Sequence, residues 1–80
     1  MNTALRALFC DVLRLQPEEV VDDLCLGQVS QWDSLGHMNL VGAIEQEYGF
    51  ELTFEEIVGL RSFADACALV QAKHDTGEDQ

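Results

Sequence analysis

Apolar residues recur at helical spacing along most of this 80-residue chain, and this periodicity limits the fold more than any other feature. Near the amino terminus, the i, i+3, i+4, i+7 pattern of an amphipathic helix is formed by Leu5, Leu8, Phe9 and Val12. No segment shows the apolar and polar alternation of a half-buried strand. We therefore predict an all-α chain whose first helix covers about residues 3–15.

A long connection follows, because Pro17 ends the first helix and the helical periodicity lapses until Asp33. A connection of this length is unusual in so small a domain, so it should contain a short turn near Pro17-Glu18-Glu19 or serve a function. Four apolar side chains are available to pack it onto the core: Leu24, Leu26, Val29 and Trp32.

A second helix is predicted from Ser34 to about Tyr48, with Asp33 as its amino-terminal cap and Gly49 at its end. At about 100° per residue, one side of this helix should face the core through Leu40, Val41, Ile44 and Tyr48. A second stripe lies roughly opposite and consists of Leu35, Met38 and Gly42, with Glu45 at its edge. An apolar stripe edged by acidic residues is typical of a reversible docking surface, whereas the simpler interpretation is that Leu35 packs under the long loop.

Two further helices complete the prediction. Thr53 and Glu56 have the spacing of a capping box and should begin a short third helix that ends near Gly59. The fourth helix should begin at Ser62 and pack through Phe63, Ala66, Cys67 and Val70. The expected fold is a small four-helix bundle with a long first loop and a short third helix, made of a domain over residues 1–75 and a polar carboxyl-terminal tail at 76–80.

The formal net charge of −11 indicates which partners the chain can bind. From Leu15 to Leu60 there is no Lys or Arg, so nucleic acid and anionic membranes should repel this surface, and its partners should be basic. Solubility alone would also explain the acidity. The apolar runs are too short to span a bilayer and no secretory signal precedes them, so we expect a cytoplasmic monomer.

Metal and enzyme sites are not predicted. Cys10, Cys25 and Cys67 are widely spaced and should remain reduced thiols. The loop acids lack the alternating ligand spacing of a calcium hand, although their number allows diffuse binding of divalent ions. Ser34 and His37 could be taken as nucleophile and base, but no third group would orient them and no oxyanion hole is evident. We expect His37 at the edge of the core.

The tetrapeptide Trp32-Asp33-Ser34-Leu35, placed before an amphipathic helix in an acidic chain of this length, resembles the attachment site of the acyl carrier proteins. The leading helix, the long acidic loop, the later Ile44-Glu45-Gln46-Glu47-Tyr48-Gly49 and the two last helices fit the same family, so the resemblance covers nearly everything from Leu5 to Gln71. It implies a four-helix bundle that performs no chemistry on its cargo.

The resemblance also implies a cofactor and a site. A phosphopantetheinyl transferase would use coenzyme A and magnesium to join 4'-phosphopantetheine to Ser34, and the arm would carry acyl groups as thioesters. Asp33 would cap the helix and help to hold magnesium during the transfer. Acyl-loading and acyl-processing enzymes with basic docking patches would bind a surface that matches Leu35, Met38, Asn39, Gly42, Glu45 and Glu47.

Three positions depart from fatty-acid carriers of this family. Asn39 and Gln46 stand where an acidic residue is common, and Gly42 replaces a larger apolar residue. With these departures, and with Gly36 and His37 after the serine, the chain is similar to discrete carriers of polyketide, mixed polyketide-peptide or related pathways. A D-alanyl or peptidyl carrier, and a small helical interaction domain that is never modified, are the alternatives.

Overall fold

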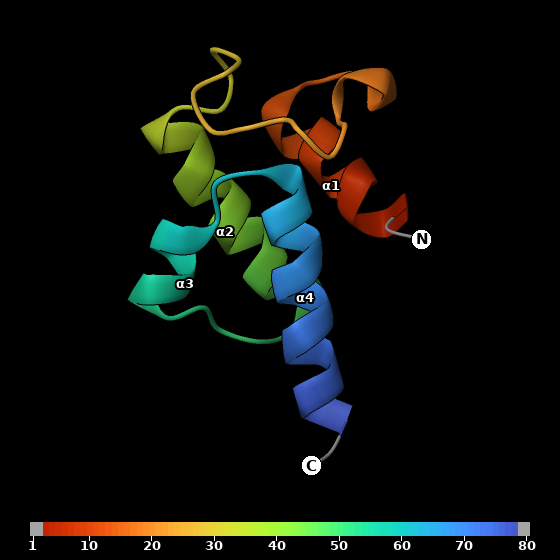
Figure 1. The fold of residues 1–80 in the computed structure, drawn as a ribbon, viewed down its shortest axis with the longest axis vertical. Coiled ribbons are helices and arrows are strands. Elements are labelled where there is room, and N and C mark those ends of the chain that lie inside the picture. Colours follow the sequence, from red (N-terminus) through yellow and green to blue (C-terminus); the bar gives the residue numbers. More distant parts are fainter. Residues whose placement is uncertain (1–2, 79–80) are drawn as a thin grey trace.

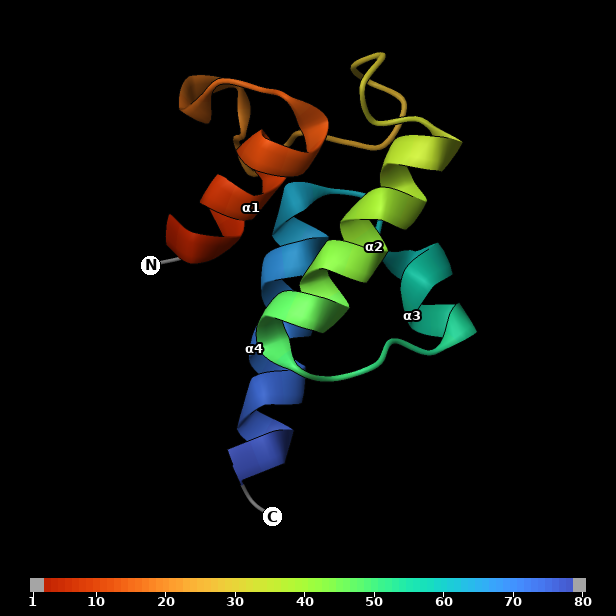
Figure 2. The ribbon, with the colours of Figure 1, turned by 180° about the vertical axis from the view of Figure 1, so that it is seen from behind.

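The computed structural model describes the backbone of residues 3–78 and the side chains of residues 3–73 (Figure 1). Within this part the fold is all-α. Its elements are α1 (Thr3–Leu13), a short 3-10 helix η1 (Pro17–Glu19), α2 (Ser34–Tyr48), α3 (Phe54–Gly59) and α4 (Phe63–Glu78). The predicted four-helix bundle with a long first loop and a short third helix is therefore confirmed. Seen from either side, α3 lies next to α2 and away from α1 (Figures 1 and 2).

The first helix ends two residues earlier than predicted. Arg14 adopts a left-handed conformation with a φ of 59°, and the amide of Leu15 donates to the carbonyl of Cys10 (3.0 Å). This is the geometry of a helix carboxyl-terminal cap, so the chain turns before Pro17 rather than at it. The turn brings Leu15 into the core, where it is 5% exposed.

The long connection between α1 and α2 is packed and hydrogen-bonded, as predicted. Its expected short turn is η1. Further along, the amide of Leu26 donates to the carbonyl of Arg61 (2.8 Å), and the amide of Phe63 donates to the carbonyl of Leu24 (2.9 Å). These bonds tie the connection to the end of the segment between α3 and α4 and to the first residue of α4. The path of the connection before Ser34 therefore depends on its hydrogen bonds to Arg61 and Phe63.

Local caps determine the limits of the other helices. Gly49 ends α2 with a φ of 74°, in agreement with its predicted role. The capping box of α3 is present in both directions, since Thr53 and Glu56 each accept from the other's amide. Ser62 Oγ accepts from the amide of Asp65 (3.0 Å), so Ser62 precedes α4 instead of being its first residue. α4 includes residues 76–78 of the predicted tail, and residues 79–80 lie outside the described part.

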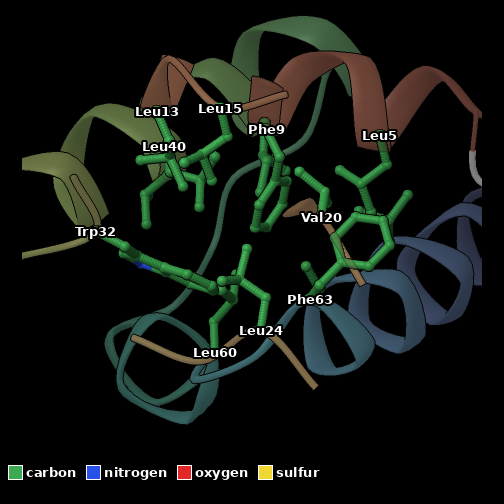
Figure 3. Packing of buried hydrophobic residues seen from close by; sticks show 14 of the residues in the cluster. Leu5, Phe9, Leu13, Leu15, Val20, Leu24, Trp32, Leu40, Leu60 and Phe63 are labelled. Carbon is green, nitrogen blue, oxygen red and sulfur yellow. The ribbon is translucent and has the colours of Figure 1, made fainter. Parts of the chain in front are cut away.

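The core is centred on the ring of Phe9, which is fully buried (Figure 3). Edge-to-face contacts join it to Trp32 (5.3 Å between ring centroids) and to Phe63 (4.9 Å). Because these three rings come from α1, the long connection and α4, one aromatic cluster fixes three segments together. Other buried side chains surround it, among them Leu5, Leu13, Val20, Leu24, Leu40, Ile44, Leu60 and Ala66. The predicted core residues Tyr48 and Cys67 are only half-buried.

Candidate functional site at the start of α2

Ser34 is the first residue of α2 and is exposed to solvent. Asp33 precedes it in an extended conformation, and Asp33 Oδ1 accepts a hydrogen bond from the amide of Gly36 (2.9 Å). The carbonyl of Asp33 accepts from the amide of His37 (2.8 Å) and so begins the ladder of the helix. The predicted cap is therefore confirmed, and it leaves the Ser34 hydroxyl at the mouth of the helix.

The surroundings of Ser34 favour a phosphate group. Asp33 satisfies the amide of Gly36, whereas the first amides of α2, at Ser34 and Leu35, have no partner in the described part of the chain. Unpaired N–H groups and the partial positive charge of a helix amino terminus both stabilise a bound anion. The residues present thus fit a phosphodiester on the serine oxygen, with no basic side chain needed nearby.

Below this mouth, His37 connects the start of α2 to α3. The indole N–H of Trp32 donates to His37 Nδ1 (3.0 Å), and His37 Nε2 lies 2.9 Å from the carbonyl oxygen of Ile57. An indole nitrogen can only donate, so Nδ1 accepts and the proton of the neutral ring is on Nε2, which donates to Ile57. Both ring nitrogens are occupied and the side chain is 8% exposed. His37 is therefore a structural residue, as expected, and it is no base for Ser34.

Gly36 is required by a close approach that the sequence interpretation missed. It is buried, and a Cβ at this position would collide with the carbonyl oxygen of Gln31. The backbone before Trp32 thus passes directly over the first turn of α2. A glycine two residues after the serine is the only sequence signal of this contact.

The predicted docking residues fall into three places. Leu35 and Met38 are 72% and 54% exposed, and Asn39 and Gly42 are exposed beside them. Glu45 is half-buried, because its Oε2 accepts from the amide of Leu52 (2.8 Å) at the entry to α3.

Glu47 lies at another edge of α2, where it lines an open groove against α1 together with Ala43 and Gln46. The structure therefore gathers four of the six predicted docking residues, which are Leu35, Met38, Asn39 and Gly42, on one outward side. Glu45 is hydrogen-bonded to the amide of Leu52, and Glu47 borders the groove against α1.

The three cysteines lie apart from Ser34 and differ in burial. Cys10 and Cys67 are half-buried, Cys25 is exposed, and all three are free thiols. Burial raises the pKa of the Cys67 thiol and so disfavours its reactive thiolate. Across the described residues, no three His, Cys, Asp or Glu side chains are grouped to hold a metal ion. None of the described helices has the length and apolar character needed to cross a bilayer.

Comparison with known proteins identifies this arrangement. A family model described as "Phosphopantetheine attachment site" matches residues 3–70. The chain is also 30% identical to a protein named "Acyl carrier protein" from Thermosynechococcus vestitus, over 69 residues that cover 86% of this chain and 85% of the relative.

The family model covers α1, α2, α3 and the first half of α4, and the relative's match covers 86% of the chain, so both matches extend well beyond the motif. In acyl carrier proteins the matched domain is the site of covalent 4'-phosphopantetheine attachment, and such proteins act with a phosphopantetheinyl transferase and with the enzymes of a pathway. This chain belongs to the acyl carrier protein family and is a carrier, not an enzyme.

Proposed function

We propose that Ser34 is the residue that receives the 4'-phosphopantetheine arm, and that the arm presents acyl intermediates to the enzymes of a polyketide, fatty-acid-like or mixed polyketide-peptide pathway. One observation supports the site above others: Ser34 is an exposed hydroxyl on the first turn of a capped 15-residue helix. In the transfer, the Ser34 oxygen would bond to the phosphorus next to pantetheine, the diphosphate P–O bond of coenzyme A would break and release adenosine 3',5'-bisphosphate, and the serine proton would pass to a base of the transferase or to water.

The chain's own residues have separate parts in this proposal. Asp33 is an exposed residue that holds the first turn by accepting from Gly36 through Oδ1, and its carboxylate would help to bind magnesium during the transfer. The unpaired amides of Ser34 and Leu35 stabilise the phosphodiester once it has formed. The terminal thiol of the bound arm would carry the acyl group as a thioester. A cytoplasmic location is part of the same proposal.

Mass spectrometry of the intact protein tests the attachment. Incubation with coenzyme A, magnesium and a broad phosphopantetheinyl transferase should add one arm to the wild type and none to Ser34→Ala. Ser30→Ala is the matched control, because Ser30 is an exposed serine of the loop just before the motif. A folded wild-type chain that gains no mass with several transferases would support the alternative of an unmodified interaction domain.

Recognition on α2 forms the second part of the proposal. The exposed side with Leu35, Met38, Asn39 and Gly42 contributes apolar contact area, and the acidic surface steers basic partners. Met38→Glu should slow loading without loss of helicity. Met38 suits this test better than Glu45, because Glu45→Lys would also remove the acceptor for the amide of Leu52. Loading kinetics equal to those of the wild type would exclude Met38 from the docking surface.

The type of pathway is proposed from the acidic residues and the larger apolar residue that this surface lacks. Asn39, Gly42 and Gln46 are all exposed, so none of them is substituted for reasons of packing. At Gly42 a Cβ would meet nothing within 4 Å, which leaves space for a larger residue. A docking helix with fewer acids and less apolar area than that of fatty-acid carriers fits partners of a different pathway. Identification of the thioester on protein isolated from its native host would decide between an acyl, a D-alanyl and a peptidyl cargo.

A further inference from the structure

The residues just before Ser34 are held against the residues just after it. The carbonyl oxygen of Gln31 lies so close to Gly36 that a Cβ there would collide with it. Asp33 Oδ1 accepts from the amide of Gly36 (2.9 Å), and the carbonyl of Asp33 accepts from the amide of His37 (2.8 Å). Ser34 takes part in none of these contacts, so its position follows from that of its neighbours.

A further contact between the same two segments is made by side chains alone. The indole N–H of Trp32 donates to His37 Nδ1 (3.0 Å), and the two rings are stacked with an angle of 21° between their planes. Trp32 is fully buried and His37 is buried. Water does not replace a buried hydrogen bond when it is lost, so the bond restrains the indole more than an exposed one would. His37 therefore holds the direction of the Trp32 side chain.

The direction of Trp32 bears on Ser34 because Asp33 alone separates them in the chain. The peptide units between them are planar and place consecutive Cα atoms about 3.8 Å apart, so a shift of the Trp32 backbone also moves the Asp33 carboxylate and the Ser34 hydroxyl. A misplacement of about 1 Å at a reacting group can slow a reaction by about a hundredfold.

We propose that His37 is a positioning residue for the loading of Ser34, which acts by holding the indole of Trp32. This inference rests on the proposed attachment at Ser34. Loss of the bond lowers the fraction of bound carriers whose hydroxyl is correctly placed for attack on phosphorus, and so slows the chemical step. The affinity for the transferase depends on the exposed side of α2 proposed for docking, to which the buried bond does not belong.

Two substitutions of His37 separate its bond to Trp32 from its bond to Ile57. In asparagine the amide oxygen is bonded directly to Cγ, as Nδ1 is in histidine, so His37→Asn keeps an acceptor for the indole. In glutamine the amide nitrogen is one atom further along, as Nε2 is in histidine. His37→Gln therefore keeps a donor for Ile57 and leaves the indole without its acceptor.

Single-turnover loading with coenzyme A, magnesium and an excess of a broad phosphopantetheinyl transferase measures the chemical step and the affinity separately. His37→Gln should lower the maximal rate by about tenfold or more, and should change the transferase concentration at half-maximal rate by less than about twofold. His37→Asn should keep most of the wild-type rate. Trp32→Phe removes the donor instead of the acceptor and should repeat the loss seen with His37→Gln.

A general loss of stability is controlled by Val70→Ala. Val70 is a buried residue of α4 outside the contacts around Ser34, and its truncation leaves a cavity, so this variant should be less stable and yet load at the wild-type maximal rate. Circular dichroism checks that each variant is folded. Hydrogen exchange of the indole N–H, followed by NMR at the single tryptophan, shows in which variants the bond is kept.

The outcomes separate the two proposals. A wild type that is never loaded contradicts the attachment at Ser34. A wild type that is loaded, with a folded His37→Gln that loads at the same maximal rate, overturns the positioning role and leaves the attachment intact. An equal loss of rate in Val70→Ala overturns it as well, and so does a rate that does not follow the protection of the indole N–H among the His37 variants. If those variants do not fold, Trp32→Phe decides, and a wild-type rate for it is equally contrary.

Discussion

Leu35 and Leu40 have the same side chain on the same helix, yet Leu40 is fully buried and Leu35 is 72% exposed. The difference between these two leucines represents the two sides of α2. The inner side, with Leu40, Val41 and Ile44, contributes to the core, and the outer side leaves Leu35 and Met38 largely exposed to solvent. The residues of α2 that form the core and the residues proposed for docking lie on opposite sides of the helix. One set can therefore change without altering the other.

The largest expected difference between the two sides is in stability. Leu40→Ala should lower the free energy of unfolding by about 2–5 kcal/mol, since it leaves a cavity in a well-packed core. Leu35→Ala, the same truncation on the outer side, should change it by less than about 0.5 kcal/mol. Urea unfolding followed by circular dichroism measures both. A large loss for Leu35→Ala would mean that the outer side packs against part of the chain.

The hydrogen bond between Trp32 and His37 should have the next largest effect. Trp32→Phe deprives the buried Nδ1 of its donor, which should cost about 1–3 kcal/mol in addition to the loss of ring area. A double-mutant cycle with His37→Leu isolates the bond, because the loss of ring area is common to both backgrounds. Strictly additive losses would show that the bond contributes nothing to stability.

The two glycines of α2 are expected to respond in opposite directions. Gly36→Ala should destabilise the fold by about 1–3 kcal/mol, because the new methyl group meets the Gln31 backbone. Gly42→Ala should stabilise it by about 0.5–1 kcal/mol, because the position is open and alanine is the better helix former. Thermal unfolding compares the pair directly. Shifts of the same sign would contradict the different surroundings assigned to the two sides.

The smallest effect is expected on α3, whose inner side includes Glu56. The hydrogen bond from the amide of Thr53, and next the contact with Lys73, lower the pKa of Glu56 from its ordinary value of 4.5. A lowered folded pKa stabilises the protein at pH values above 4.5, and this contribution is lost as the pH falls through the folded pKa. Glu56→Gln should therefore lower Tm near neutral pH, with the difference closing in acid. A difference independent of pH would exclude this linkage.

Much of the fold was predictable because its signals act within a few residues. The limits of α2 follow from Asp33 and Gly49, and the start of α3 follows from the capping box of Thr53. The end of α1 was placed two residues too late, because no local sequence signal marks it. Arg14 adopts a conformation that usually selects glycine, so no residue type indicated where the helix stops.

The candidate site was predictable only in part. The motif identified Ser34 and its cap, but nothing near it indicated that His37 would contact Ile57, twenty residues later. Helical periodicity gives the direction of a side chain around its own axis and does not say which neighbouring helix lies on that side. Periodicity placed Glu45 at the edge of the Met38 stripe, and the family resemblance added Glu47 to the same surface. Glu45 is instead bonded at the entry to α3, and Glu47 borders the groove toward α1.

The sequence by itself determined an all-α chain, the cap at Asp33 and an exposed serine at the start of α2, because hydrogen bonds within one helical turn depend on adjacent residues. Only the tertiary structure decided what surrounds that serine. The close approach at Gly36, the bonds of His37 to Trp32 and Ile57, and the bond of Glu45 to Leu52 all arise where separate segments pack together. Packing depends on the volume and direction of every side chain in the core, which no local pattern encodes.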